Sequence, residues 1–176
     1  NTITIDVTPE INDAPEGTDN TVATPEDTDY VFTAADFGFS DPNDSPADDF
    51  LAVKITTLPT AGTLTLTGGT NAGAVSTGQF ISVADINAGY LAFTPATDAS
   101  GTGYATFTFQ VQDDGGTANT GDVDLDPTAN TITIDVTPEI NDAPEGTDNT
   151  VATPEDTDYV FTAADFGFSD PNDSPA

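Results

Sequence analysis

The sequence Pro9-Glu10-Ile11-Asn12-Asp13-Ala14-Pro15 occurs a second time, unchanged, as Pro138-Glu139-Ile140-Asn141-Asp142-Ala143-Pro144. The identity extends outward from this stretch, because residues 1–47 match residues 130–176 letter for letter. The two copies are offset by 129 positions, the separation of Pro138 from Pro9. A fixed period of this length indicates one domain copied along the chain, not a solenoid of small repeats.

The repeat predicts three segments. Residues 1–13 hold the last strand of a preceding repeat plus its linker, residues 14–141 a complete domain, and residues 142–176 the first strands of the next repeat. One period is an ordinary length for a single domain with its own core. The two incomplete ends lack a second layer of structure. We therefore expect them to be disordered in solution, or completed by strands of neighbouring molecules in a crystal.

The charge of the chain is strongly one-sided. It contains 31 acidic residues against a single basic one, Lys54, for a formal net charge of −30. Such a chain repels nucleic acid and anionic membranes, so we predict neither as a partner. It also repels itself, and divalent cations are the obvious candidates to neutralise part of this charge.

Several residue types are missing. The absence of Cys and His excludes disulfides, thiolate or imidazole metal sites and histidine-based acid–base chemistry. Carboxylate pairs could in principle hydrolyse glycosides, but without His, Cys or Arg beside them we do not expect an enzyme. The sequence shows no apolar run long enough to span a membrane and no signal peptide, so we predict no direct membrane insertion.

Alternating apolar and polar residues predict an all-β fold rather than disorder. The longest predicted strand, residues 103–112, would bury Ala105, Phe107, Phe109 and Val111. A half-buried strand is predicted at residues 2–7 and again at 131–136. Further strands are expected at 18–24, 30–32, 50–58, 62–67, 79–82 and 90–94, with helical turns at 34–37 after Thr33 and at 83–87 after Ser82. About seven short strands favour an antiparallel β-sandwich of the immunoglobulin or cadherin kind, with a jelly roll or small barrel as the alternative.

If successive strands run up and down, the acidic loops gather at the two ends of such a domain. The entering end would hold Asn12, Asp13, Asp41, Asn43, Asp44, Asp113 and Asp114. The exit end would hold Glu26, Asp27, Asn141 and Asp142, with Asp170, Asn172 and Asp173 of the next repeat. Further candidates are Glu10, Glu139, Asp122, Asp124 and Asp126. Six to eight carboxylate, amide and carbonyl oxygens are what Ca²⁺ takes, so we predict these residues as metal ligands.

A simpler interpretation of these residues stays open. Loop Asp and Asn residues often only form turns and cap helices, and we assign Asp19, Asp29, Asp36, Asp85 and Asp98 to that role. The alternating acids at 122, 124 and 126 could equally line a solvated strand.

The chain resembles a known family in several motifs. Residues 140–144 (INDAP) are similar to the linker of cadherin repeats, and residues 41–44 (DPND) to their Asp-x-Asp loop. Residues 111–116 (VQDDGG) resemble their late acidic-glycine turn, and Pro25-Glu26-Asp27 is placed like their early glutamate. The whole period resembles the cadherin-like tandem repeats of giant bacterial biofilm adhesins of the RTX type. It departs from animal cadherins in its longer loop at 113–129 and in Asn43, where their motif has Asp.

This resemblance implies a function and a location. It implies type I secretion to the bacterial cell surface, several Ca²⁺ ions per repeat, mainly at the linkers, and neighbouring identical repeats as partners. We therefore expect a spacer, or extender, that Ca²⁺ makes rigid and that holds an adhesive tip away from the cell. The alternative is a module that itself binds a glycan, a surface or ice. Its Thr-x-Thr pairs, such as Thr106 and Thr108, are more simply the outward phase of ordinary strands.

Overall fold

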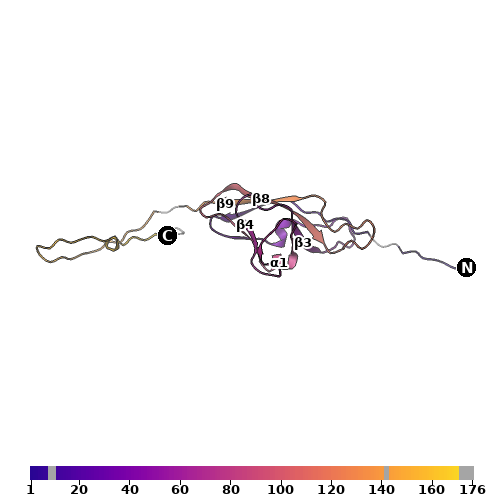
Figure 1. Ribbon diagram of the computed structural model, residues 1–176, viewed down its shortest axis with the longest axis horizontal. Helices are drawn as coiled ribbons and strands as arrows, with labels where there is room; N and C mark the ends of the chain where they lie inside the picture. Colours follow the sequence, from indigo (N-terminus) through magenta and orange to yellow (C-terminus); the bar gives the residue numbers. More distant parts are fainter. Residues whose placement is uncertain (8–10, 141–142, 171–176) are drawn as a thin grey trace. The chain divides into compact units, whose positions relative to one another are not determined.

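The computed structural model describes residues 1–7, 11–140 and 143–170. Contacts divide the chain into two compact units, Asn1–Pro138 and Glu139–Ala176, and each is described by itself. The first unit contains, in order, β1 (Asn20–Pro25), β2 (Tyr30–Val31), η1 (Ala34–Phe37), β3 (Phe50–Ile55), β4 (Thr63–Leu66), β5 (Gly73–Ala74), β6 (Phe80–Ser82), α1 (Val83–Asn87), β7 (Leu91–Thr94), β8 (Gly101–Asp113) and β9 (Asn130–Thr137) (Figure 1). The second contains η2 (Ala163–Phe166). No helix among the described residues has the length and apolar character that a membrane crossing needs.

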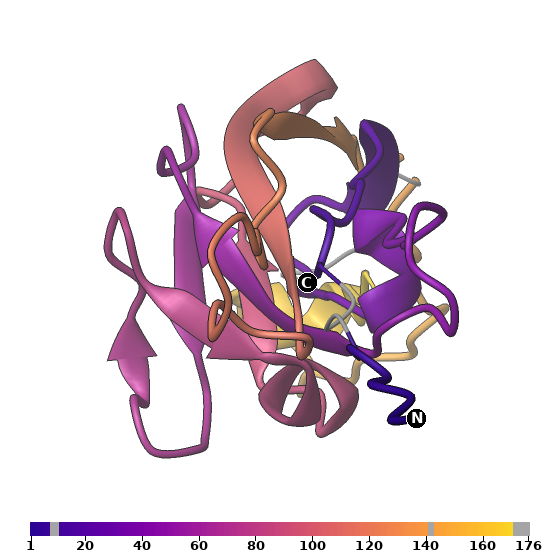
Figure 2. The same ribbon diagram turned by 90° about the vertical axis from the view of Figure 1, so that its right-hand side faces the viewer.

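The strands of the first unit form two sheets, so the fold is all-β. One sheet has the order β1-β9-β8-β3-β6 and the other β2-β7-β4-β5. The second sheet is antiparallel, whereas the first is mixed because β1 pairs with β9 in parallel. Figure 2 shows the strands of both sheets in a view turned by 90°. Among the described residues, the structure has nine strands where about seven were predicted, partly because the two-residue β5 lies in a stretch predicted as a turn.

The parallel pairing of β1 with β9 corrects the purely antiparallel prediction. Asn20 lies opposite Ile132 and Pro25 opposite Thr137, so the two strands begin at one end of the sheet and finish at the other. The whole unit lies between them in sequence, which leaves ample chain for a parallel connection. The chain therefore enters this unit at one end and leaves it at the opposite end.

One hydrophobic core takes side chains from both sheets. The alternation predicted for β8 is confirmed: Ala105, Phe107, Phe109 and Val111 are all buried. Leu64, Leu66, Leu91 and Phe93 of the second sheet, and Ile132, Ile134 and Val136 of β9, belong to the same cluster. The rings of Phe93 and Tyr104 meet edge to face across the two sheets, with centroids 6.4 Å apart. Such aromatic pairs add to the apolar area that the core removes from water.

Two short helical turns begin where their capping residues predict. The carboxylate of Asp36 accepts hydrogen bonds from the Thr33 backbone N–H at 2.7 Å and from its hydroxyl at 3.0 Å, and η1 follows. Ser82 Oγ accepts from the Asp85 N–H at 3.1 Å at the start of α1. These contacts satisfy backbone groups that a helix end leaves without partners.

Identical sequences adopt different structures at the two ends of the first unit. Residues 130–136 lie within β9, whereas residues 1–7 contain no strand. Ile134 is completely buried, whereas its counterpart Ile5 is 81% exposed. The prediction of a strand at 2–7 is therefore wrong for this segment. The burial of β9 comes from β1 and β8, which pair with it on either side, and not from its own sequence.

Candidate metal centre

Four chain segments converge at the end of the first unit where β9 begins. Because β8 and β9 are antiparallel and Phe109 lies opposite Asn130, the last residues of β8 extend past this end. The turn after β8 meets the entering chain at Asn12, the loop after η1, and the loop at 119–123. A pocket of about 190 Å³ opens among them, lined by Asn12, Asp44, Asp48, Gly115, Asn119, Asp122 and two apolar residues.

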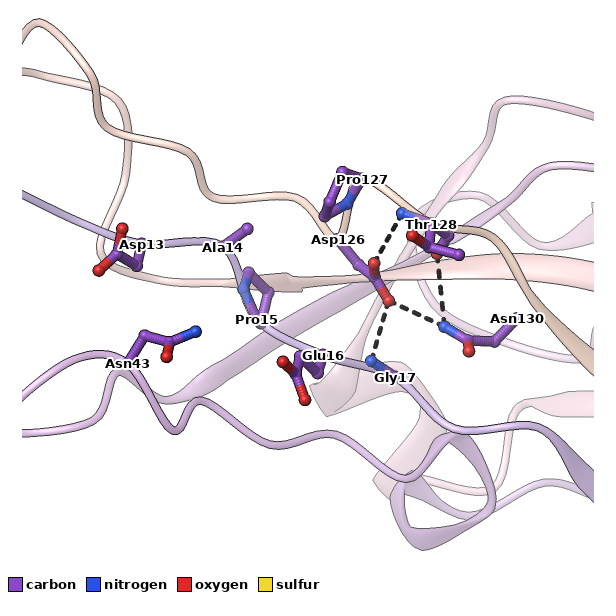
Figure 3. Close-up of a pocket in the computed structure, with 10 residues that line it drawn as sticks. All are labelled: Asp13, Ala14, Pro15, Glu16, Gly17, Asn43, Asp126, Pro127, Thr128 and Asn130. Carbon is purple, nitrogen blue, oxygen red and sulfur yellow. Dashed lines mark hydrogen bonds between the residues drawn. The ribbon is translucent and has the colours of Figure 1, made fainter.

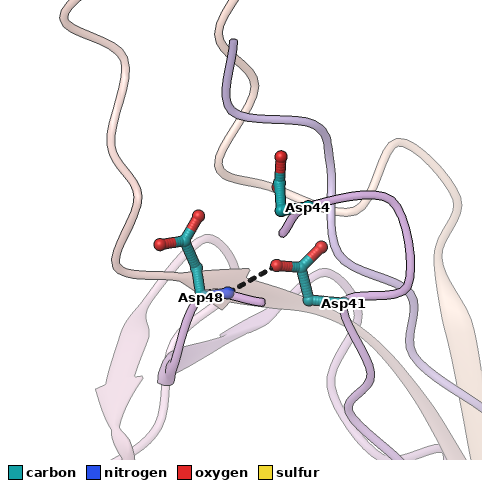
Figure 4. Close-up of side chains that lie close together, drawn as sticks. All are labelled: Asp41, Asp44 and Asp48. Atoms are coloured by element: carbon teal, nitrogen blue, oxygen red, sulfur yellow. Dashed lines mark hydrogen bonds between the residues drawn. The ribbon is translucent and has the colours of Figure 1, made fainter. Parts of the chain in front are cut away.

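Three carboxylates of the loop after η1 form the centre of this site. Asp41, Asp44 and Asp48 each offer an oxygen, and these oxygens all lie within 4.8 Å of one another (Figure 4). The loop holds them in place through backbone donors: Asp41 Oδ2 accepts from the Asp48 N–H at 2.7 Å. Both Asp44 oxygens accept from the Asp13 N–H, at 3.2 and 3.0 Å. Asp41 is buried, and the other two are half-buried.

The side chain of Asn12 is held in one orientation. Its Nδ2 donates to Asp113 Oδ1, to the Gly116 carbonyl and to the Val123 carbonyl, at 3.2, 3.1 and 3.0 Å. Its backbone N–H donates to Asp122 Oδ1. With the amide nitrogen surrounded by acceptors, Oδ1 must point to the other side. There it lies against the Cα of Gly115, next to the Asp48 carboxylate.

Gly115 permits this close approach. A Cβ atom at this position would collide with both Asn12 Oδ1 and Asp48 Oδ2. The glycine is needed here for space, because any side chain would push apart the two oxygens that converge on it.

Asp113 is a fully buried acid at the base of the site. Its Oδ1 accepts from Asn12 Nδ2 and from the Gly115 N–H at 3.0 Å. Burial raises the pKa of Asp113, and the charges of Asp48 and Asp124 raise it further, while its two hydrogen bonds oppose the shift. The site is therefore electrostatically unfavourable for a carboxylate that has no cation beside it.

Three buried oxygens of this cluster accept no hydrogen bond from any described residue: Asn12 Oδ1, Asp41 Oδ1 and Asp113 Oδ2. All three side chains are more than nine-tenths buried. Buried polar atoms without partners are rare, and each one costs free energy unless water or an ion satisfies it. An oxygen-only set of acids plus one amide is the donor set of a hard divalent cation, so these residues could hold a metal ion.

A second pocket beside the entering chain is built differently. It has a volume of about 440 Å³ and is lined by Asp13, Asn43, Asp126 and neighbouring residues (Figure 3). Asp126 is buried, but Oδ2 accepts from the Gly17 N–H and from Asn130 Nδ2, and Oδ1 accepts from the Thr128 N–H. The Asp126 carboxylate thus joins the entering chain to the start of β9, and both of its oxygens accept hydrogen bonds.

The other predicted ligands are dispersed. Asp114 Oδ1 accepts from the Asp49 N–H, and Asp124 Oδ2 accepts from Gln112 Nε2. Glu26 and Asp27 lie at the opposite end of the unit, where the Glu26 N–H donates to the Thr137 carbonyl and Asp27 Oδ1 accepts from the Asp98 N–H. Glu139 and Asp170 belong to the second unit. Glu10, Asn141, Asp142, Asn172 and Asp173 lie outside the described residues.

The sequence reasoning missed Asp48. In the sequence, Asp48 is one of several acidic residues in a loop with two prolines, and nothing distinguishes it from the adjacent Asp49. The difference arises in the folded loop, where Asp48 approaches Asp41 while the Asp49 backbone pairs with Asp114.

Comparisons of the chain with protein-family models, with curated proteins and with solved structures found no match.

Proposed function

We propose that this chain is a spacer whose rigidity depends on Ca²⁺, made of tandem β-sandwich repeats of the immunoglobulin or cadherin kind, in a long bacterial surface adhesin. One observation carries the proposal: at the end of the unit where the linker enters, the side chains of Asn12, Asp41 and Asp113 each bury an oxygen that accepts no hydrogen bond from any described residue. The bacterial, secreted and adhesive parts of the proposal rest on the family resemblance of the sequence motifs.

Ca²⁺ suits the oxygen cluster better than Mg²⁺ does. The proposed ligands come from a linker amide, from carboxylates of the loop after η1 and from Asp113 at the end of β8, which gives irregular spacing. Ca²⁺ accepts six to eight such oxygens in flexible geometry, whereas Mg²⁺ demands a tighter octahedron and keeps more of its water. Extracellular modules bind Ca²⁺ with dissociation constants of about 10⁻⁴ to 10⁻³ M. An array of these units would then be slack inside the cell and stiff outside.

The position of Asn12 connects ion binding to stiffness. Asn12 belongs to the linker motif, yet its side chain reaches the turn after β8 and the loop at 119–123. An ion held by Asn12 Oδ1 and the acids would fix the linker against the unit. Without the ion, the clustered carboxylates repel one another in partly desolvated surroundings.

The strand order suits a spacer. Because the chain enters at one end of the unit and leaves at the other, identical copies would add length end to end. A strand such as β8, with 13 residues, spans about 40 Å at about 3.3 Å per residue. Each copy would therefore extend the array by roughly that length.

Small-angle X-ray scattering of a chain with two complete repeats tests this function. We expect Ca²⁺ to lengthen the particle and narrow its distribution of shapes relative to chelator. Asp41→Asn in both repeats should remove the response, while Asp6→Asn, which removes the same charge from an exposed position, should leave it intact. Identical scattering curves in Ca²⁺ and chelator for the wild-type chain would refute the spacer function.

A further inference from the structure

The outer face of the five-stranded sheet is almost free of negative charge. Of the 31 acids in the chain, the strands β1, β3, β6, β8 and β9 contain two, Asp113 and Asp135. Asp113 is fully buried, which leaves Asp135 as the one acid of these strands on the outer face. Asp19, which precedes β1, stands at the margin of the face and accepts from the Thr131 N–H. Two copies of a chain with a net charge of −30 therefore repel each other least across this face.

The centre of this outer face consists of threonines flanked by one cation and one anion. Residues of β8 and β9 alternate between the core and the outside, so threonines line up across the two strands: Thr106 lies opposite Thr133, and Thr108 opposite Thr131. The lateral face, as we call this surface, has six half-buried members: Thr106, Thr108, Thr131, Thr133, Lys54 and Asp135. Its formal charge is zero, because one lysine balances one aspartate.

Both charged groups of the lateral face are oriented by contacts within the sheet. Lys54 is the one basic residue of the chain, and its ammonium lies 5.6 Å from the centroid of the Phe80 ring on the neighbouring β6. Such cation–π contacts restrict where an ammonium lies. The Gly103 N–H donates to Asp135 Oδ1 at 2.6 Å, which fixes the carboxylate while Oδ2 can accept from another donor.

The strand register places these two charges symmetrically about the middle of the lateral face. Lys54 lies opposite Gln110 of β8, whereas Asp135 lies opposite the irregular stretch at 102–104, and β8 itself lies between β3 and β9. The two charges are therefore roughly 20 Å apart along the strands, too far for an ion pair within one copy. A two-fold axis that lies in the interface and crosses β8 at the lateral-face threonines brings Lys54 of each copy to Asp135 of the other.

The other sheet is uncharged as well, but it holds no pair of opposite charges. Its strands β2, β4, β5 and β7 contain no charged residue. A contact through that sheet would have no ion pair to set its register, because charges at an interface specify orientation more than they add affinity. The lateral face is therefore the side of the unit where charge can specify a single arrangement of two copies.

We propose that two copies of this chain associate side by side through their lateral faces, with two Lys54–Asp135 ion pairs flanking a centre of threonines. The centre leaves water without burying an unpaired charge. Because β1 and β9 both run from the entering end to the opposite end, the lateral face points sideways from an array and stays accessible when copies join end to end. The face recurs in every repeat, so contacts that are weak singly act together along an array.

Zero-length carbodiimide cross-linking tests this contact directly, because the reagent couples an amine only to a carboxylate that touches it. The chain offers Lys54 and its N-terminal amine. We expect cross-linked dimers that contain a Lys54–Asp135 peptide in mass spectrometry, a link that the separation of roughly 20 Å within one copy allows only between copies. Lys54→Gln and Asp135→Asn should each lower the dimer yield several-fold. Dimers without this peptide, or linked mainly through other carboxylates, would overturn the proposal.

Charge exchange, followed by sedimentation velocity, provides a second test. Lys54→Asp places two acids opposite each other and Asp135→Lys places two lysines opposite each other, so each should weaken dimerisation by about tenfold or more. Lys54→Asp/Asp135→Lys restores opposite charges and should dimerise like the wild type. Asp29→Lys, which changes the net charge as Asp135→Lys does but at an exposed position outside the lateral face, should not weaken dimerisation.

Two results would contradict the pairing: a wild-type chain that stays monomeric at about 1 mM, or a double variant that dimerises as weakly as the single ones. The lateral face contains none of the proposed metal ligands, so we expect the same order of the variants in Ca²⁺ and in chelator. Failure of this contact would therefore leave the calcium site unaffected, and failure of the calcium site would leave this contact unaffected.

Discussion

At the scale of single residues, the candidate site is distinguished by where its hydrogen bonds are missing. Asp113, the last residue of β8, and Asp126, in the connection from β8 to β9, are both buried acids, yet their environments differ. Asp126 accepts from Gly17, Thr128 and Asn130, whereas Asp113 Oδ2 has no donor among the described residues. One carboxylate therefore stabilises the loop directly, and the other is suited to contact a cation.

This contrast predicts opposite effects of the same substitution. Asp113→Asn removes a buried negative charge beside Asp48, so in chelator it should stabilise the unit by about 1–2 kcal/mol, or roughly 3–8 °C in melting temperature. It should also weaken the stabilisation by Ca²⁺. Asp126→Asn replaces an acceptor with a donor and should cost about 1–3 kcal/mol in chelator and in Ca²⁺ alike. Thermal melting of both variants measures these effects, and destabilisation by Asp113→Asn in chelator would contradict the first.

The raised pKa of Asp113 predicts how the difference in melting temperature between the wild type and Asp113→Asn depends on pH in chelator. The folded state holds this proton more tightly than the unfolded chain, whose carboxyl has its ordinary pKa of 3.8. The contribution of Asp113 to stability is therefore full below that value and is lost as pH rises through the folded pKa. The two melting temperatures should converge at low pH and separate as pH rises. A difference in melting temperature that stays constant with pH would show that Asp113 does not titrate in this way.

At the scale of elements, identical residues behave differently at the two ends of the first unit. The alternation of apolar and polar residues correctly predicts β8 and β9. Both strands are paired on either side within the sheet, so their apolar faces are buried. The same sequence that forms a strand at 130–136 forms none at 1–7. Whether a strand is buried depends on the strands that pair with it, and the pattern of its own residues does not specify those partners.

Matched substitutions in the two copies test this difference. Ile134→Ala empties a fully buried site and should cost about 2–5 kcal/mol in the free energy of unfolding. Ile5→Ala, in identical local sequence but exposed, should change stability by no more than about 0.5 kcal/mol. Denaturant unfolding of the two variants provides the comparison, and similar losses would mean that residues 1–7 are buried in solution.

Most of the fold, but only part of the candidate site, could be predicted from the sequence. Local signals sufficed for the capped turns η1 and α1 and for the apolar face of β8. The parallel pairing of β1 with β9 was not predicted, because alternation shows where strands lie in the sequence but not which strands pair with each other. The part played by Asp48 and the tethering role of Asp126 depend on how two long loops fold against each other, which their composition does not specify.

At the scale of the whole molecule, both the net charge of −30 and the clustered carboxylates of the candidate site call for positive charge to neutralise them. Monovalent salt screens general self-repulsion, but it does not supply the ligand-binding charge of a divalent cation to Asn12 Oδ1, Asp41 Oδ1 and Asp113 Oδ2, which accept no hydrogen bond from any described residue. In chelator, we expect added NaCl to raise the melting temperature gradually for the wild type and for Asp41→Asn alike. Ca²⁺ at matched ionic strength should raise it further only for the wild type. Equal responses of the two proteins to Ca²⁺ would indicate general screening.

The most direct test of the calcium site is a calorimetric titration of Ca²⁺ into the metal-free chain, repeated with Mg²⁺ and with the Asp41→Asn and Gly115→Ala variants. We predict saturable Ca²⁺ binding with a dissociation constant of about 10⁻⁴ to 10⁻³ M or tighter, and weaker binding of Mg²⁺. Both variants should lose that binding, since one removes a ligand charge and the other separates Asn12 from Asp48. No saturable Ca²⁺ binding by the wild-type chain, or the same binding in both variants, would contradict the central claim that this oxygen cluster is a calcium site.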